Sequence, residues 1–220
     1  MRLYIDTASE TTVQSFAQYG FLDGITTNPS LVAAEGLSYR ETIDRLSGLI
    51  DGPVFAQVLA RDADGMVEEG RTYASWAEDV IIKIPATPAG YEALNRLRSE
   101  GVAAGITVLF SVPQAILAAK NDATFVAPYV GRLTDAGEDG IDVVTGIQEA
   151  FDAYGFETEV LAASVRNGRQ ATGLYRAGVD AITLPELTLK DHFEHHKTTA
   201  GIEGFEADWG DRSSPIKNTE

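Results

Sequence analysis

Short apolar segments typical of β-strands alternate with helical segments along most of this 220-residue chain. The strand-like segments are residues 3–7, 24–28, 54–60, 80–86, 105–110, 125–130, 159–164 and 181–185. The helical segments are residues 10–19, 39–50, 63–77, 89–100, 113–120, 139–154, 169–177 and 187–196. Such alternation indicates an α/β fold with a parallel sheet and right-handed crossovers. Eight repeats of the unit predict a (β/α)8 barrel, the TIM barrel.

A doubly wound open sheet is the alternative fold. It usually has fewer strands, and a glycine-rich phosphate-binding turn often follows its first strand. Here the first strand continues as "YIDTASE", which contains no G-x-G-x-x-G pattern. The barrel is therefore favoured over the open sheet.

The C-terminal segment predicts one helix beyond the eight repeats. In "TTAGIEGFEADWG", Ile202, Phe205 and Trp209 fall on one stripe, which needs a covering surface. That surface is either a neighbouring subunit or the chain's own barrel. We expect residues 1–210 to form a single barrel domain with this helix, followed by a polar tail over residues 211–220.

Composition narrows the classes of partner. The net charge is -16, from 33 acidic and 17 basic residues, and such a surface repels nucleic acid. The acidic excess suggests a protein of a salt-rich cytoplasm. The sequence contains no cysteine, no apolar run long enough for a membrane span and no apolar signal-peptide region. We therefore expect a cytoplasmic protein without nucleic-acid or membrane partners.

Polar residues embedded in apolar strands recur in seven of the eight predicted strands, near their carboxyl ends. They are Asp6, Thr26, Gln57, Lys83, Thr107, Tyr129 and Ser164, with Thr27 and Asn28 beside Thr26. A lone threonine or serine in a strand is more often a satisfied core residue than a site residue. Their repetition is harder to explain in that way, because buried polar groups must find partners. Barrel enzymes carry their active sites at this end of the strands.

Lys83 is the most informative of these residues, because it lies within the β-branched run "VIIKIP". Side chains alternate along a strand, so Lys83 faces the barrel axis if Ile82 and Ile84 face the helices. Loss of water disfavours an ammonium ion, and a neutral amine in a dry pocket attacks carbonyl groups to form an imine. The equally weighted alternative is a structural lysine paired with Asp6.

Metal chemistry has little support. The histidines of the chain, His192, His195 and His196, lie in "KDHFEHH", which lacks the zincin spacings and falls on a predicted outer helix. A solvated helix face is the better interpretation. No metal and no cofactor are expected.

Three arginines follow the sixth and seventh strands. They are Arg132 in "VAPYVGR" and Arg166 and Arg169 in "LAASVRNGR". Arginine binds phosphate through two hydrogen bonds, and barrels often hold phosphate near the seventh and eighth strands. These arginines are candidate ligands of an anionic substrate; surface pairing with the many carboxylates is the alternative.

Taken in order, "GITTNPSL", "VIIKIPATPAGYEAL", "GITVLFSVPQA", "VAPYVGR" and "LAASVRNGRQ" resemble the small-subunit transaldolase and fructose-6-phosphate aldolase family over nearly the whole chain. The resemblance implies a (β/α)8 barrel and a metal-free, class I (Schiff-base) aldolase acting on sugar phosphates. It also implies a homo-oligomer, a pentamer or decamer built through the C-terminal helix.

The resemblance assigns the catalytic roles. It implies that Lys83 forms the imine and that Asp6 binds substrate hydroxyls and assists proton transfer at C–C cleavage. It implies that Tyr129 is the acid/base for imine formation and hydrolysis, acting through a water that Gln57 and Thr107 hold.

The resemblance also assigns the substrate-binding roles. Asn28 and Ser164 would bind the dihydroxyacetone portion, and Thr26 would shape that pocket. Arg132 and Arg166 would hold the phosphate of the acceptor.

Two branches of the family differ near the imine. Transaldolases typically have Glu and Phe where this chain has Gln57 and Tyr129, which is the aldolase pattern. The flanking "TVLFS" and "VGRL" resemble transaldolases instead, and "SVRNGRQ" resembles members that act on sulfonated sugar phosphates. We favour the fructose 6-phosphate aldolase, because the deciding residues contact the chemistry. Dihydroxyacetone transfer is the main alternative, and a sulfo-sugar enzyme or a non-catalytic binding protein ranks lower.

Overall fold

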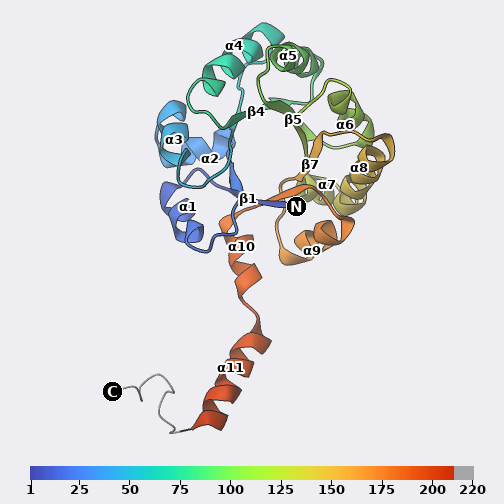
Figure 1. Cartoon of the computed structure of the whole chain (residues 1–220). Helices are drawn as coiled ribbons and strands as arrows, with labels where there is room; N and C mark the ends of the chain where they lie inside the picture. Colours follow the sequence, from blue (N-terminus) through green and yellow to red (C-terminus); the bar gives the residue numbers. More distant parts are fainter. Residues whose placement is uncertain (211–220) are drawn as a thin grey trace.

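A closed parallel barrel forms the body of the molecule (Figure 1). The computed structural model describes residues 1–210, and eight strands lie in sequence order within them. The strands are β1 (Arg2–Asp6), β2 (Gly24–Thr26), β3 (Val54–Gln57), β4 (Val80–Pro85), β5 (Ala104–Leu109), β6 (Phe125–Pro128), β7 (Glu159–Ala162) and β8 (Ala181–Leu184). The pairing of β8 with β1 completes the ring, so the predicted (β/α)8 barrel is confirmed. The predicted tail, residues 211–220, lies outside the described residues.

Helices surround the barrel, and several begin at ordinary capping residues. They are α1 (Glu10–Ala17), α2 (Pro29–Glu35), α3 (Tyr39–Leu46), α4 (Ala63–Ala74), α5 (Pro88–Ser99), α6 (Val112–Ala119), α7 (Val130–Asp135), α8 (Gly140–Tyr154), α9 (Gly168–Ala177), α10 (Glu186–Phe193) and α11 (His196–Trp209). Ser38 and Glu41 form a capping box at the start of α3, and the Thr87 side chain caps α5. The predicted helices are present, with ends shifted by a few residues.

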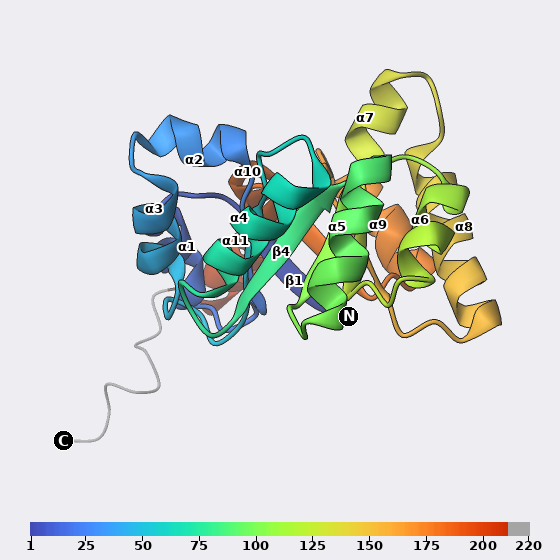
Figure 2. The same cartoon turned by 90° about the horizontal axis from the view of Figure 1, so that it is seen from above.

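Two short helices were not predicted, α2 and α7. We expected strands to continue to residues 28 and 130, but β2 and β6 end earlier and these helices follow almost at once. The Oδ1 atom of Asn28 accepts hydrogen bonds from the amides of Ser30 (3.0 Å) and Leu31 (3.1 Å), and Pro29 occupies the first turn. Figure 2 shows α2 and α7 at the same end of the barrel, toward which the β4 arrow points. They therefore rim the carboxyl end of the strands.

The single helix predicted for residues 187–196 is wrong at its end. α10 stops at Phe193, and α11 begins at His196. Extended backbone at Glu194 and His195 separates the two helices. His192 and His196 consequently lie on different helices.

The core has two layers separated by the strands. Outside the barrel wall, residues such as Ile82 and Ile84 are fully buried under the helices. Inside it, Phe55 packs edge-on against both Tyr4 and Phe125, with ring centroids 5.2 and 5.1 Å apart. Because Tyr4 and Phe55 precede Asp6 and Gln57 by two residues, the rings form an apolar floor beneath the polar strand ends.

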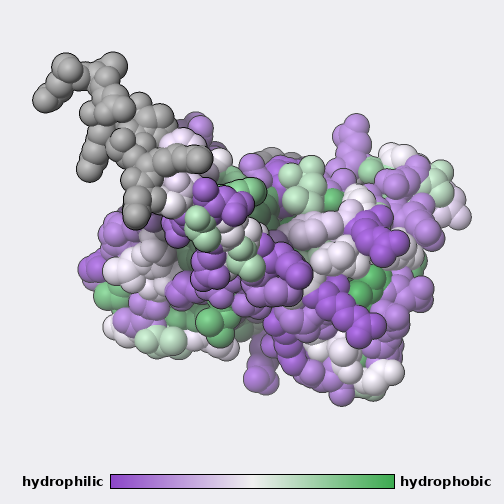
Figure 3. Space-filling model, turned by 90° about the horizontal axis from the view of Figure 1, so that it is seen from below, coloured by the Kyte–Doolittle hydropathy of each residue, from purple (hydrophilic) through white to green (hydrophobic). Residues whose placement is uncertain are grey.

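The predicted C-terminal helix is present as α11, and Figure 1 shows it pointing away from the barrel. Ile202 and Phe205 are 53% and 76% exposed, so this stripe does not pack on the chain's own barrel. A neighbouring subunit as its cover remains a prediction. Hydrophilic residues cover much of the face seen in Figure 3, as the net charge of -16 requires. Among the described helices, none is long and apolar enough to cross a membrane.

Candidate active site

A cavity of about 490 Å³ opens at the carboxyl ends of the strands. The predicted site residues in its wall are Asp6, Thr26, Asn28, Gln57, Lys83, Tyr129, Arg132 and Ser164. Residues that we did not predict complete the wall, namely Pro29, Ser30, Leu31, Val108, Ala163 and Thr183. The cavity therefore gathers most of the predicted residues; Thr107, Arg166 and the further anion candidate Arg169 fall outside its lining, as does Thr27.

Lys83 faces the inside of the barrel, as strand alternation predicted. Its neighbours Ile82 and Ile84 are fully buried in the outer core, whereas Lys83 lines the cavity and is 5% exposed. Its Nζ atom donates a hydrogen bond to the carbonyl oxygen of Thr27 at 2.8 Å. None of the ion pairs within residues 1–210 includes Lys83, so the alternative of a lysine in contact with Asp6 is not observed.

Asp6 ends β1 and accepts a hydrogen bond on its Oδ1 from the Thr26 hydroxyl at 2.9 Å. The Thr26 hydroxyl also contacts that of Thr183 at 2.7 Å, so the three side chains form one chain of hydrogen bonds. Burial raises the pKa of Asp6 above its usual range, and Lys83 and Thr26 offset part of that increase. Such a carboxyl group is suited to exchange a proton with a substrate hydroxyl.

Thr183 was missed, although the sequence contained a signal for it. It is the polar residue of the eighth strand, "AITLP", and thus extends to β8 the pattern seen in the other strands. Its side chain is 3% exposed and lines the cavity.

Gln57 ends β3 and is held through its main chain. The hydroxyl of Tyr39, from α3, accepts a hydrogen bond from the Gln57 amide at 2.5 Å and donates to the Gln57 carbonyl at 3.2 Å. Burial raises the pKa of Tyr39 to about 12, so its phenol stays protonated near neutral pH. The Oε1 atom of Gln57 is buried and has no hydrogen-bond partner among the described residues. Gln57 lines the cavity, and Tyr39 fixes the main chain that carries it.

Tyr129 lies just beyond β6, and its ring lines the cavity. The Thr107 hydroxyl, fully buried behind it, donates to the Tyr129 hydroxyl at 3.3 Å. The phenol oxygen thus accepts one proton, and its own O–H remains available for donation into the cavity. Thr107 acts on the site through Tyr129 although it does not line the cavity.

A bulge in β5 produces this arrangement. The register against β6 shifts between Thr107 and Leu109, and Val108 has φ of 55°. A β-branched residue in this left-handed region is strained. Thr107 and Val108 both lie on the inner side of β5, and Leu109 is buried in the outer core. The other strained residue at the site is Ser164, with φ of 57°.

The three arginines predicted to bind an anion differ in their position relative to the cavity. The Arg132 guanidinium lies over the Tyr129 ring, 4.9 Å from its centroid, and lines the cavity. Arg166 instead forms an ion pair with Asp135 of α7 at 2.6 Å, and Arg169 is exposed. No ion pair of Arg132 occurs within residues 1–210, so Arg132 is the arginine best placed to bind an anion in the cavity.

Gly131, in the first turn of α7, contacts the loop after β7 that carries Arg166. Its amide donates to the Ser164 carbonyl at 2.9 Å. A Cβ atom at this position would lie 2.3 Å from that carbonyl oxygen and 2.6 Å from the Nε atom of Arg166. The lack of a side chain therefore permits the close approach of α7 and the loop after β7.

Asn28 contributes only part of its amide to the cavity. Because its Oδ1 atom caps α2, its NH2 group is the part that can donate to a ligand hydroxyl.

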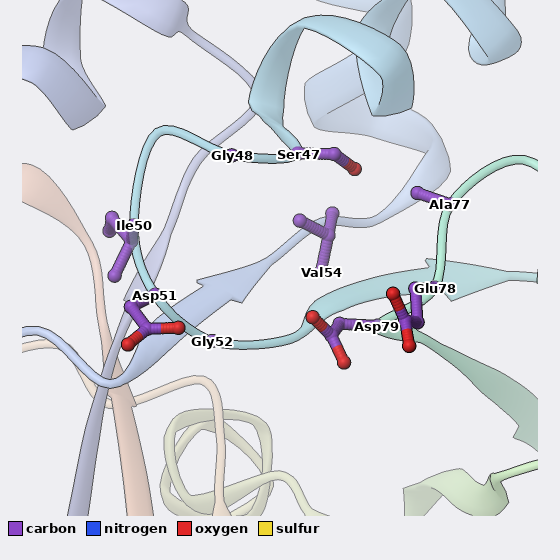
Figure 4. A pocket seen from close by; sticks show the side chains of 9 residues that line it. All are labelled: Ser47, Gly48, Ile50, Asp51, Gly52, Val54, Ala77, Glu78 and Asp79. Atoms are coloured by element: carbon purple, nitrogen blue, oxygen red, sulfur yellow. The ribbon is translucent and has the colours of Figure 1, made fainter.

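A second hollow, of about 500 Å³, lies between the α3–β3 and α4–β4 connections, at the opposite end of the barrel (Figure 4). The carboxylate of Asp51 lies apart from those of Glu78 and Asp79 in it. None of the predicted site residues lines this hollow. Among residues 1–210, no group of three or more acidic or histidine side chains is arranged to hold a metal ion.

Solved structures with this arrangement of strands and helices include proteins of other activities. Thiamine phosphate pyrophosphorylase from Pyrococcus furiosus matches with a TM-score of 0.57 at 18% identity, covering 84% of this chain and 85% of that one. A mandelate oxidase mutant matches with a TM-score of 0.58 at 16% identity, covering 84% and 65%. At such identities the likeness shows the barrel fold alone.

Sequence comparison is more specific. The probable transaldolase of Methanococcus vannielii is 44% identical over 209 residues, covering 95% of this chain and 97% of that protein. Those of Coprothermobacter proteolyticus and Novosphingobium aromaticivorans are each 42% identical, covering 95% and 98% of this chain and 96% and 100% of their own. The family model described as transaldolase/fructose-6-phosphate aldolase matches residues 3–216. The chain therefore belongs to the transaldolase/fructose-6-phosphate aldolase family of enzymes.

Proposed function

We propose that this protein is a class I aldolase that splits fructose 6-phosphate, or a close sugar-phosphate analogue, through an imine on Lys83. The products are dihydroxyacetone and glyceraldehyde 3-phosphate. The observation that carries the proposal is a buried lysine inside the barrel, in one cavity with Asp6 and Tyr129. An amine, a carboxyl group and a phenol around one space are the groups that imine chemistry needs.

The reaction follows from these groups. The Lys83 amine adds to the C2 carbonyl of the sugar, and loss of water leaves a protonated imine. Asp6 takes the proton of the C4 hydroxyl, the C3–C4 bond breaks, and its electron pair moves into the imine to form an enamine. Glyceraldehyde 3-phosphate departs, a proton returns to C3, and water hydrolyses the imine to free dihydroxyacetone and Lys83.

Tyr129 and Gln57 support cleavage over transfer. The O–H of Tyr129 remains available for donation, because its oxygen accepts from Thr107. We propose that it protonates the enamine or assists hydrolysis through a water held with Gln57, which lines the same cavity. The bound three-carbon unit is then released before a second aldehyde arrives.

Arg132 supports an anionic substrate. We propose that it holds the phosphate of the acceptor half, and that Arg166 joins it when the phosphate competes with Asp135. A sulfonated sugar phosphate would satisfy the same two guanidinium groups.

Transfer of dihydroxyacetone between sugar phosphates is the second candidate. The observation that favours it is the description of the similar proteins as probable transaldolases. We also propose a cytoplasmic homo-oligomer, pentamer or decamer, in which another subunit covers the exposed face of α11.

Assay with fructose 6-phosphate alone separates the candidates. Release of glyceraldehyde 3-phosphate without an added acceptor supports the aldolase; turnover only with erythrose 4-phosphate would refute it. Tyr129→Phe should raise transfer relative to cleavage, and an unchanged ratio would contradict the role of the phenol.

Borohydride reduction tests the imine itself. With substrate present it should add a three-carbon unit to Lys83. Lys83→Ala should lose both adduct and activity, whereas Lys120→Ala, at an exposed lysine, should keep both. Absence of the adduct from the wild-type protein would reject both candidates.

A further inference from the structure

We propose that Thr183 is a positioning residue, which orients the Thr26 hydroxyl and through it the Asp6 carboxyl group. This inference rests on the proposed function, in which Asp6 exchanges a proton with the substrate. It concerns a residue on β8, outside the set that the sequence pattern selected.

The direction of the hydrogen bonds follows from counting protons. Thr26 has one hydroxyl proton, and while Asp6 is ionised that proton must be donated to Oδ1, 2.9 Å away. The 2.7 Å contact between Thr26 and Thr183 then requires Thr183 as its donor. The relay therefore runs from Thr183 to Thr26 to Asp6.

The two threonines lie where they can fix the position of Asp6 at the end of β1. In the barrel β1 lies between β2 and β8, which carry Thr26 and Thr183. Asp6 is in register with Thr26, and Tyr4 with Thr183, so the contact between the threonines links the two neighbours of β1 across its inner face. Both threonines are almost fully buried, at 1% and 3% exposed, so water cannot readily replace either partner.

An ordinary core threonine would be satisfied by its surroundings and would leave the site unaffected. Thr183 differs in two respects. It lines the cavity, and the one hydrogen bond of its side chain among the described residues is to Thr26. Its proton is therefore committed to the hydroxyl that binds the catalytic carboxyl group.

The consequence is that the two carboxyl oxygens of Asp6 have different partners. Oδ1 is held by Thr26, which leaves Oδ2 for the substrate. Without the Thr183 donor, the Thr26 hydroxyl can rotate and its donation to Asp6 weakens. The ionised carboxyl group then loses a hydrogen bond that offsets the effect of burial on its pKa. The other titratable or charged groups that line the cavity with Asp6 are Lys83, Tyr129 and Arg132.

Thr183→Val tests the relay, because valine keeps the shape and removes the donor. Thr183→Ser restores the donor. Thr42→Val is the matched control, since the side chain of this buried threonine donates its hydrogen bond to the carbonyl of Ser38, the N-cap of its own helix. Each variant is measured in two ways, by the pH profile of kcat/KM for fructose 6-phosphate cleavage and by titration of the Asp6 carboxyl ¹³C signal.

We expect Thr183→Val to lower kcat about tenfold, the rate equivalent of one hydrogen bond. The acid limb of the profile and the ¹³C midpoint should both move to higher pH, Thr183→Ser should reverse these changes, and Thr42→Val should cause none. An unchanged ¹³C midpoint in Thr183→Val, or failure of serine to restore it, overturns the inference whatever the substrate is. Loss of the borohydride adduct from wild-type Lys83 would overturn the proposed function instead, so the two failures are distinguishable.

Discussion

Replacement of Tyr39 by phenylalanine removes one buried hydroxyl that bonds both main-chain groups of Gln57. The Gln57 amide would then be buried without an acceptor, which costs about 1–3 kcal/mol. A loss of about 2 kcal/mol lowers Tm by about 4–8 °C for a protein of this size. We expect this decrease, together with a lower kcat, because the strand end that carries Gln57 would be free to move.

Tyr73→Phe provides the matched control. The Tyr73 ring packs edge-on against that of the half-buried Tyr39, with centroids 5.1 Å apart, and Tyr73 is buried. Its hydroxyl, however, forms no hydrogen bond with any residue in the part of the chain that the structure describes. We expect its free energy of unfolding to change by about 0.5 kcal/mol or less.

Urea denaturation and thermal melts of the two variants, with the cleavage assay beside them, measure the difference. Equal stability of Tyr39→Phe and Tyr73→Phe would refute the reasoning, because the two changes differ mainly in the bonds to Gln57. A stability loss in Tyr39→Phe with wild-type kcat would show that the clamp stabilises the fold without positioning Gln57.

Three further results are expected. Because burial raises the pKa of Asp6, the native state holds that proton more tightly than the unfolded chain, and wild-type stability falls as pH rises through the interval between the two pKa values. Asp6→Asn should therefore melt at a higher temperature than the wild type at neutral pH and should lose this advantage in acid below about pH 4. Its kcat should fall about 100-fold or more, because the group that exchanges the proton is gone. A lower Tm of the variant at neutral pH would contradict the stability argument. Gly131→Ala should raise KM for phosphorylated substrates by displacing Arg166. Gly146→Ala in α8 should leave KM unchanged, because its Cβ would make an ordinary 3.5 Å contact with Val112. Equal KM values for the two variants would exclude the steric argument. Added KCl should raise Tm by screening the net charge of -16, and a Tm independent of salt would count against a protein adapted to high salt.

The barrel and most of its site were predictable from local patterns. Strand alternation alone placed Lys83 inside the barrel and Ile82 and Ile84 outside it. α2 and α7 were not predictable from apolar periodicity, because each is too short to show it. The Asn28–Pro29 pair was the available signal, as an N-cap followed by a proline in the first turn.

The remaining features depend on contacts that no local pattern encodes. Ordinary alternation along "TVLF" would turn Val108 outward and Leu109 inward, and the bulge reverses both. The ion pair between Arg166 and Asp135 joins the loop after β7 to the end of α7. The hydrogen bonds between the Tyr39 hydroxyl and the Gln57 main chain likewise join residues that only the folded barrel brings together.

The bulge in β5 also bears on how this enzyme can change. A regular strand presents one inward side chain at every second residue, so a new inward residue normally requires the loss of an outward one. At Val108 the strand carries an additional inward residue, whereas Leu109 stays in the outer core. Position 108 is thus a point at which selection can reshape the cavity wall one side chain at a time, while the packing between barrel and helices remains as it is.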